Sequence, residues 1–241
     1  MTRTSYSSVY AIRSNNLSEL FIAEHQKEWH NWSKKQRYRC KDCGKQFLTR
    51  YTYRAYLPET KTLIIKMTLN GSGIRDISRV LEISANTVLT TIKQRATEIS
   101  EPRVPKRIGN VEIDEFWSFV EKKKSQRWTW YAFDRERKKV VAFQNGRRTD
   151  ENCQLLLDKL KGCRIRNYHT DAWESYYKFI PPEKHFVGKC GTVNIERNNL
   201  NFRTHLKRLE RRTICFSKSE EIHDAVIKIY VWHSNQKRHH F

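Results

Sequence analysis

Three acidic residues stand where a carboxylate is either costly or well placed for chemistry. Asp114 lies inside a predicted strand, before an aromatic run, where an acid destabilises the fold unless it has a partner or a metal. Asp171 ends a later predicted strand in HTDAW, and Glu196 opens a predicted helix in NIERNN. Acids in these places can converge across one edge of a sheet. Converging carboxylates suit hard divalent ions such as Mg²⁺ or Mn²⁺, and two such ions promote phosphodiester cleavage.

The helix that begins near Glu196 is rich in cationic and amide side chains. Apolar residues recur at roughly helical spacing through 195–209, and most of the other residues are basic or amide. The helix dipole offers an alternative explanation for Glu196, because an acid in a first turn gains about 0.3 kcal/mol or more. Arg203 shares the face of Glu196 two turns later, and Arg197 and Lys207 flank it. We predict that these basic side chains hold DNA phosphates.

Other acids near the three carboxylates are expected to differ in position. Glu112 has the same strand parity as Asp114 and is expected nearby, whereas Glu115 is expected to point the other way. Glu174 stands one helical turn beyond Asp171, where a solvated position is expected.

The elements that must position the carboxylates follow a recognisable order. β-Branched and aromatic runs separated by polar turns predict a three-stranded meander over 111–148. After it we expect a helix over 149–162 capped by Thr149 or Asp150, a strand over 164–170, a helix through Tyr177, a strand near 185–188 and the Glu196 helix. This order predicts an RNase H-like α/β fold.

A small helical module is predicted before this domain. Helices are expected over 58–70, 74–82 and 85–99, with Pro58 near the first start and Ser84 as the cap of the third. Two short helices, a tight turn and a polar third helix are typical of a helix-turn-helix, although an ordinary three-helix bundle is the alternative. In a helix-turn-helix the residues facing the major groove would be Asn86, Thr87, Thr90, Thr91 and Lys93.

The N-terminal region contains one candidate metal knuckle, in QRYRCKDCGKQF. Cys40 and Cys43 have the spacing of two zinc ligands, and the glycine after them permits a tight turn. His25 and His30 are candidates for the other two ligands. We therefore expect four regions: a partly zinc-ribbon-like region over 1–57, the helix-turn-helix over 58–100, a basic two-proline linker over 101–107 and the catalytic domain over 108–241.

The charge of the chain indicates a polyanionic partner. Its 241 residues include 47 Lys and Arg against 26 Asp and Glu, a formal net charge of +21. Double-stranded DNA is the leading candidate. A membrane surface is a weaker one, because the basic residues are spread through folded segments. No apolar run approaches a spanning length and the first residues lack a signal-peptide core, so we expect a cytoplasmic, nucleoid-associated protein.

Several of these stretches together resemble the transposases of the bacterial insertion sequence one family: IDEFW, QRWTWYAFDR, TDAW, IERNNLNFRTHLKRL and FSKSEEIHDAVI. The resemblance covers about 111–230, and 24 residues separate Asp171 from Glu196, the short spacing that family shows. It implies that Asp114, Asp171 and Glu196 are the DDE triad. The implied activity is magnesium-dependent cutting at the terminal inverted repeats and transfer of the freed 3′-hydroxyl to target DNA. Pairing two ends implies a homodimer or higher oligomer.

The chain departs from the family pattern at its N-terminus. Members usually carry a cysteine pair upstream of the knuckle, where this chain has MTRTSYSSVYAIRS and AEHQKEWH. Either His25 and His30 replace that pair, or the zinc module is degenerate. Two other functions stay open: a sequence-specific DNA-binding regulator, which would gain nothing from an acid inside a strand, and an RNase H-like nuclease or resolvase. Hydrolysis and strand transfer use the same kind of metal site, so only the family resemblance distinguishes a nuclease or resolvase from a transposase.

Overall fold

The computed structural model describes residues 25–28, 36–41, 44–48 and 53–236. The chain divides into two compact units, Met1–Tyr53 and Arg54–Phe241, and each is described by itself. The first contains an antiparallel sheet of β1 (His25–Glu28), β2 (Arg37–Cys40) and β3 (Gln46–Leu48), in that order. Gly44 follows the cysteine pair with φ +68°, and its amide donates to the Cys40 carbonyl at 3.0 Å. The predicted tight turn at this glycine is confirmed.

The zinc prediction lies largely outside the described residues. Cys43 and His30 are not described, and of His25 only the backbone is. The strand register places the Cα of His25 opposite the Cα of Cys40. In the described part of the chain there is no group of three or more side chains that could hold a metal ion. A zinc ion on Cys40, Cys43, His25 and His30 therefore stays a prediction.

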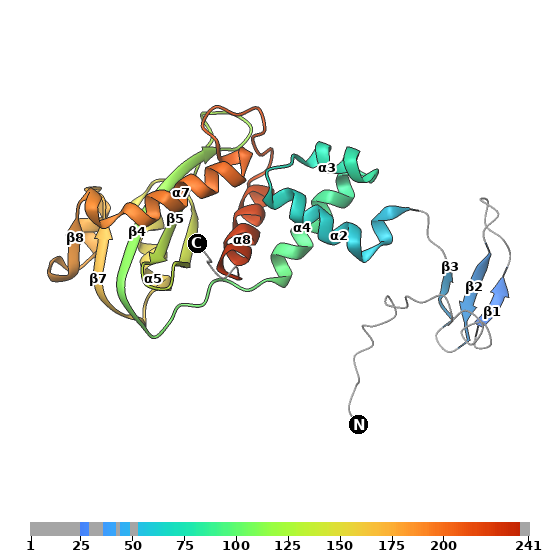
Figure 1. Ribbon diagram of the computed structural model, residues 1–241, viewed down its shortest axis with the longest axis horizontal. Coiled ribbons are helices and arrows are strands. Elements are labelled where there is room, and N and C mark those ends of the chain that lie inside the picture. Colours follow the sequence, from blue (N-terminus) through green and yellow to red (C-terminus); the bar gives the residue numbers. More distant parts are fainter. Residues whose placement is uncertain (1–24, 29–35, 42–43, 49–52, 237–241) are drawn as a thin grey trace, which may run out of the picture. The chain divides into compact units, whose positions relative to one another are not determined.

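The second unit begins with the predicted helical module (Figure 1). It consists of a 3₁₀ turn η1 (Arg54–Tyr56), α2 (Pro58–Leu69), α3 (Ile74–Leu81) and α4 (Ala85–Glu98). Pro58 occupies the first helical position of α2, where its missing amide hydrogen leaves no bond unmade. The Ser84 hydroxyl accepts a hydrogen bond from the Thr87 amide at 3.0 Å and caps α4 as predicted. The three predicted helices are thus confirmed to within one residue at their ends.

A five-stranded mixed sheet follows. Its elements are β4 (Arg107–Phe119), β5 (Gln126–Asp134), β6 (Lys139–Gly146), α5 (Asp150–Lys159), β7 (Arg164–Thr170), α6 (Glu174–Phe179), η2 (Pro182–Lys184), β8 (His185–Val187), η3 (Lys189–Gly191), α7 (Val193–His205), η4 (Lys207–Leu209) and α8 (Glu220–Gln236). The strand order is β6-β5-β4-β7-β8: β4, β5 and β6 form an antiparallel meander, β7 pairs in parallel with β4, and β8 pairs in parallel with β7. The predicted order of elements is confirmed, and it suits an RNase H-like domain.

Helices cover both faces of this sheet. Along β5 the side chains alternate: Trp130 and Ala132 pack in a core with α5 and α6, whereas Tyr131 and Phe133 pack in another with α7 and α8. Figure 1 shows α7 crossing β4 and β5 on one face. The side chains on both faces are buried, which explains the nearly continuous apolar run in the sequence.

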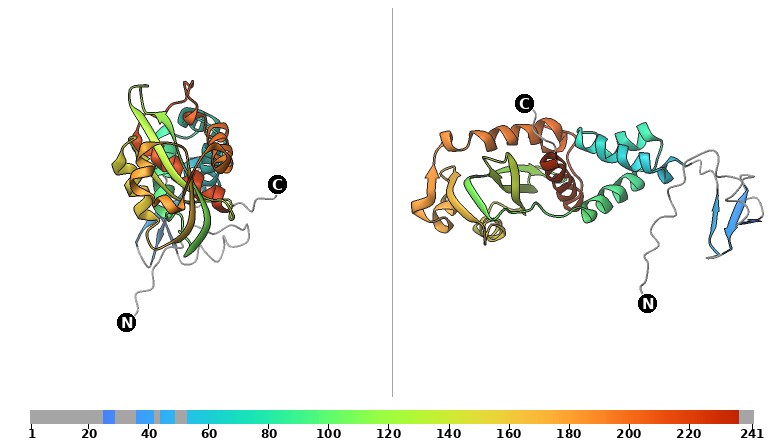
Figure 2. Two further views of the ribbon diagram at one scale, coloured as in Figure 1. Left: turned by 90° about the vertical axis from the view of Figure 1, so that its left-hand side faces the viewer. Right: turned by 60° about the horizontal axis from the view of Figure 1, so that its bottom comes forward.

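The helix-turn-helix shares a core with the sheet. Ile64, Ile77 and Ile92, from α2, α3 and α4, belong to the same buried cluster as Val226 and Ile227 of α8. Figure 2 shows α8 between the sheet and these helices, in agreement with its contacts to α2, α4 and β6. None of the helices in the described part of the chain is long and apolar enough to cross a membrane.

The prediction of one continuous helix over 195–209 is wrong at its C-terminal end. α7 ends at His205, and Leu206 has φ −115° and ψ 87° before the 3₁₀ turn η4. Leu206 and Leu209 are fully buried in the shared core. Arg203 closes the end of α7 by donating to the Leu209 carbonyl at 3.0 Å. Tertiary packing therefore ends this helix, since no proline or glycine occurs there.

A buried histidine fastens α8 to the end of β4. His223 is fully buried, and its two ring nitrogens each lie 3.0 Å from a serine hydroxyl, Ser118 on β4 and Ser217 before α8. The Arg208 guanidinium donates to Ser217 at 3.3 Å. Burial, with the charge of Arg208 nearby, lowers the pKa of His223 to about 3.

This shift makes the stability of the protein depend on pH. Between its ordinary value of 6.5 and about 3, the unfolded chain binds a proton at His223 that the folded chain does not. The free energy of unfolding should therefore fall as pH decreases through this window, by up to about 1.4 kcal/mol per pH unit. Urea denaturation from about pH 7.5 to 4.5 should show a shallower decline for His223→Gln than for wild type. Parallel curves would contradict this role.

Candidate active site

The candidate site lies where β7 stops beside β4. The two strands pair in parallel as far as Glu112 opposite His169, and β7 ends at Thr170. Continuing that register by two residues sets Asp171 level with Asp114. Beyond this point no strand of the described chain pairs with that edge of β4. The early end of β7 thus leaves Asp114 at an open edge.

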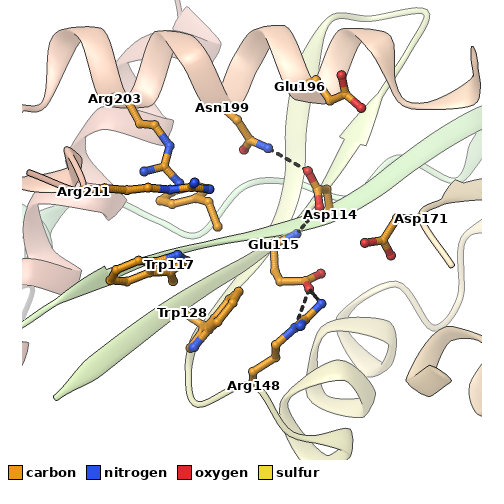
Figure 3. A pocket seen from close by; sticks show the side chains of 11 residues that line it. Asp114, Glu115, Trp117, Trp128, Arg148, Asp171, Glu196, Asn199, Arg203 and Arg211 are labelled. Carbon is orange, nitrogen blue, oxygen red and sulfur yellow. Dashed lines mark hydrogen bonds and ion pairs between the residues drawn. The ribbon is translucent and has the colours of Figure 1, made fainter. Parts of the chain in front are cut away.

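A pocket of about 460 Å³ occupies this opening. Figure 3 shows Asp114 on β4, Asp171 after β7 and Glu196 on α7 around it, with basic and aromatic side chains toward one end. The residues that line the pocket are Asp114, Glu115, Phe116, Trp117, Trp128, Arg148, Asp171, Glu196, Asn199, Arg203 and Arg211. The three carboxylates predicted from the sequence therefore share one cavity.

Asp114 is the most perturbed of these acids. One carboxylate oxygen accepts from the Asn199 amide at 2.7 Å, and the other accepts from the Glu115 backbone amide at 2.8 Å. Burial and then the nearby charge of Glu115 raise the pKa of Asp114 to about 7, and the charge of Asp171 adds to the rise. The negative charge at Asp114 is therefore poorly compensated by the protein itself.

Asp171 and Glu196 are exposed and held by short-range contacts. Asp171 accepts from the Trp173 amide at 3.1 Å, at the start of α6. Glu196 lies in the first turn of α7, and the Thr192 hydroxyl donates to it at 3.2 Å. These bonds leave further lone pairs on both carboxylates, and both side chains line the pocket (Figure 3).

Glu112 and Glu115 exchange their expected places. Glu112 does not line the pocket: it is fully buried and accepts from Arg135, from Asn194 at 2.7 Å and from the Ile195 amide at 2.8 Å. It thereby fastens the first turn of α7 to β4. Glu115 lines the pocket despite its opposite parity, because both faces of β4 reach the opening once β7 has ended.

Sequence reasoning missed several residues that line the pocket: Glu115, Trp117, Trp128, Arg148, Asn199 and Arg211. Asn199 had a readable signal, since it stands three residues after Glu196 on one helical face. The Tyr131 hydroxyl donates to the Asn199 carbonyl oxygen at 2.7 Å, which turns the amide nitrogen toward Asp114. The other five residues could not be selected from the sequence, because they line the pocket only as a result of β7 ending early beside β4.

The predicted DNA-facing residues of α4 do not share one environment. Asn86 and Thr90 are exposed, and Thr87 is partly buried beside the Ser84 cap. Thr91 is buried and donates to the Thr87 carbonyl at 2.8 Å, so its side chain is not presented at the surface. Lys93 forms an ion pair with Glu221 of α8.

The predicted phosphate-binding residues near Glu196 also lie in different surroundings. Arg203 lines the pocket, and Arg197 is exposed on α7. Lys207 is exposed as well, but it lies in η4 beyond the end of α7, so its place on the Glu196 helix was wrong.

As the side chains stand, no three acidic, histidine or cysteine groups of the described residues are close enough together to hold one ion. The donor set nevertheless suits a hard divalent cation, because it consists of carboxylate oxygens from three elements around one opening. The raised pKa of Asp114 agrees with this, since a bound cation would offset both the burial and the neighbouring negative charges that disfavour the ionised carboxylate.

Comparison with known families agrees with this architecture. The sequence profile described as IS1 transposase matches residues 108–240, which hold the five-stranded sheet except for the first residue of β4, together with all three carboxylates. The chain belongs to the IS1 transposase family. A second profile, described as InsA C-terminal domain, matches residues 51–96 and so covers the helix-turn-helix. This IS1-family protein therefore carries a helix-turn-helix DNA-binding domain and a DDE-type transposase domain in one chain.

Individual relatives belong to the same kind of element. The chain is 48% identical over 120 residues to insertion element iso-IS1n protein InsB of Shigella dysenteriae. This alignment covers 50% of the present chain and 92% of the relative. The chain is 43% identical over the same length to insertion element IS1 protein InsB of Shigella flexneri, with the same coverage. A chain of the simian T-cell lymphotropic virus intasome in complex with PP2A regulatory subunit B56 gamma aligns over 76% of both chains. Its TM-score of 0.34 and its 11% sequence identity are too low to show a shared fold.

Proposed function

We propose that this transposase binds the terminal inverted repeats of its insertion sequence, cuts the DNA at those ends and joins the freed 3′-hydroxyl to target DNA. Asp114, Asp171 and Glu196 are the catalytic, metal-binding carboxylates of this proposal. The observation that carries it is their meeting around one pocket, from β4, from the end of β7 and from α7. The helix dipole then makes only a minor contribution at Glu196.

The two reactions balance as successive displacements at phosphorus. In cutting, a water oxygen forms a bond to phosphorus and the 3′-oxygen leaves with a proton, which gives a 3′-hydroxyl and a 5′-phosphate. In joining, that hydroxyl displaces a 3′-oxygen of the target strand. Mg²⁺ or Mn²⁺ ions bound to the carboxylates would activate the attacking oxygen and stabilise the leaving one. No covalent bond to the protein forms in either step.

The remaining residues of the proposal bind DNA. Asn86 and Thr90 of α4 would contact the major groove, and their exposure supports this role. Arg203 in the pocket, with the exposed Arg197 and Lys207, supplies positive charge for phosphates. Two element ends must be held together for joining, so the active species is a dimer or a higher oligomer.

A gel assay with the full chain tests the proposal. Labelled duplex carrying the terminal repeat would be incubated with target DNA in Mg²⁺, in Mn²⁺ or with a chelator. We expect metal-dependent cutting at the repeat end together with joined products. Cutting without joining would replace the proposal by an RNase H-like nuclease. Specific binding without cutting in either metal would replace it by a DNA-binding regulator.

Asn199 should act as a positioning residue for Asp114. Asn199→Ala removes a 2.7 Å hydrogen bond to the carboxylate while leaving the carboxylate itself in place. We expect cutting to slow by about 10- to 100-fold, as for other groups that orient metal ligands, and the Mg²⁺ concentration for half-maximal rate to rise. DNA affinity should not change.

The control is Asn201→Ala, which alters an exposed amide on the same helix. Metal titrations of the cutting rate for both variants make the measurement. A lower cutting rate in Asn199→Ala without any change in metal dependence would contradict the positioning role. Tyr131→Phe should show the same defect in a smaller form, because it removes the hydrogen bond that orients the Asn199 amide.

A further inference from the structure

Two tryptophans lie in the pocket at a distance from the carboxylates. Trp117 of β4 and Trp128 of β5 are paired directly across the antiparallel strands, and both are partly buried. Figure 3 shows them on the side of the pocket away from Asp171. Trp117 lines the pocket and stacks on no other ring among the described residues.

Trp128 is held in a fixed orientation. The Arg148 guanidinium lies 5.0 Å from its ring centre and 4.9 Å from that of Trp173. Glu115 fixes this guanidinium in turn, with an ion pair of 2.7 Å, and accepts from the Tyr176 hydroxyl at 2.7 Å. The Trp128 ring is therefore preorganised, which lowers the entropy lost when a flat ligand stacks on it.

Arg203 and Arg211 line the same pocket. Neither forms an ion pair with a carboxylate of the described residues. Burial and then the charge of Arg211 lower the pKa of Arg203, whereas the charge of Asp114 across the pocket raises it. Two adjacent guanidinium groups that form no direct ion pair are suited to an anion with several oxygens. In a DNA-cutting enzyme the obvious anion is a backbone phosphate.

The spacing of these groups fits a nucleotide close to the cut. Trp117 follows Asp114 by three strand residues, which corresponds to about 10 Å. One strand of B-form DNA advances about 3.4 Å per nucleotide, so this separation spans about three nucleotides. A base inside a duplex is covered on both faces by its neighbours, and it reaches a side-chain ring only when it leaves the stack.

We propose that the pocket receives one unstacked nucleotide of the element end, within about three nucleotides of the cut, with its base on Trp117 and Trp128 and its phosphate on Arg203 and Arg211. This inference rests on the proposed function, because it needs DNA at the carboxylates. Stacking is tolerant of sequence, since every base offers a π-face. The subsite thus selects for an opened duplex end more than for a particular base.

The experiment compares end duplexes that differ at a single unpaired position. For each of the three nucleotides nearest the cut, one duplex carries a mismatched base and its twin carries an abasic site. Affinities for the full-length protein are measured in Ca²⁺, so that binding is read without requiring cutting. At one position, wild type should bind the mismatched duplex about 5- to 150-fold more tightly than the abasic twin, the effect expected for one base on an aromatic ring. It should also prefer the mismatched duplex to the fully paired one.

Variants assign that preference to the tryptophans. In Trp117→Ala with Trp128→Ala the difference between mismatched and abasic duplex should disappear, while Trp117→Phe with Trp128→Phe should retain it. Tyr177→Ala, which removes an exposed aromatic ring outside the pocket, should behave as wild type. Equal affinities for the two duplexes at every position in wild type, or a preference that survives in the alanine variant, would overturn the inference. Because the readout is affinity, this outcome is independent of whether wild type cuts and joins DNA.

Discussion

Asp114→Asn, Asp171→Asn and Glu196→Gln are each expected to lower the rates of DNA cutting and joining by at least about a thousandfold. Bound divalent ions supply several kcal/mol of transition-state stabilisation, and each 1.4 kcal/mol corresponds to about a factor of ten in rate. Each substitution replaces a charged oxygen ligand by a neutral amide of nearly the same shape. The helix-turn-helix is untouched, so affinity for the terminal repeat should stay within a few-fold of wild type.

The measurement is a gel assay for cut and joined products beside a binding assay on the same duplex. Glu174→Gln is the matched control, because Glu174 is exposed one helical turn beyond Asp171 and does not line the pocket. It should cut and join at the wild-type rate. Near-normal cutting by any one of the three variants would remove that residue from the metal-binding set.

Asp114→Asn should also make the metal-free protein more stable at alkaline pH. In the folded protein the Asp114 carboxyl keeps its proton up to about pH 7, whereas in the unfolded chain it ionises near its ordinary value of 3.8. The folded state binds more protons between these values, so the free energy of unfolding falls as pH rises through this window. At about pH 8 the ionised carboxylate destabilises the folded state by on the order of 2–3 kcal/mol, and the amide does not.

Addition of metal should make wild type more stable than Asp114→Asn. A divalent ion that binds only the folded protein stabilises wild type in proportion to the logarithm of its concentration, whereas Asp114→Asn should gain little. Thermal or urea unfolding at about pH 8, in chelator and then in rising Mg²⁺, makes the comparison, with Glu174→Gln as control. If Asp114→Asn were less stable than wild type in chelator, the hydrogen bonds from Asn199 and from the Glu115 amide would outweigh the electrostatic strain.

A stability–activity conflict at Asp114 would explain why an acid is kept inside a strand. The residue raises the free energy of the empty fold and is useful only when the pocket holds a cation. Glu112, two residues earlier, shows the contrast, because three donors satisfy its buried carboxylate and it serves the structure alone. Two acids of the same strand parity thus have opposite roles, and only their surroundings separate them.

Much of the architecture could be predicted because its signals are local. Pro58 and Gly71 bracket α2, Ser84 caps α4, and β-branched and aromatic runs between polar turns indicate the meander, and each of these patterns extends over only a few residues. The three carboxylates could also be selected, since an acid inside an apolar strand, at a strand end or at a helix start is visible in the chain itself. The family resemblance added their spacing.

What the sequence alone determined, then, was the order of elements, the helix-turn-helix and which acids to suspect. Tertiary structure decided which side chains share a cavity with those acids. Strand parity gives the face on which Glu115 and Trp117 lie, but whether that face opens into the pocket depends on where β7 ends beside β4. Likewise α7 ends at His205 because Leu206 and Leu209 enter a core built with α8 and the helix-turn-helix. Such outcomes depend on contacts between residues far apart in the chain, which no local pattern encodes.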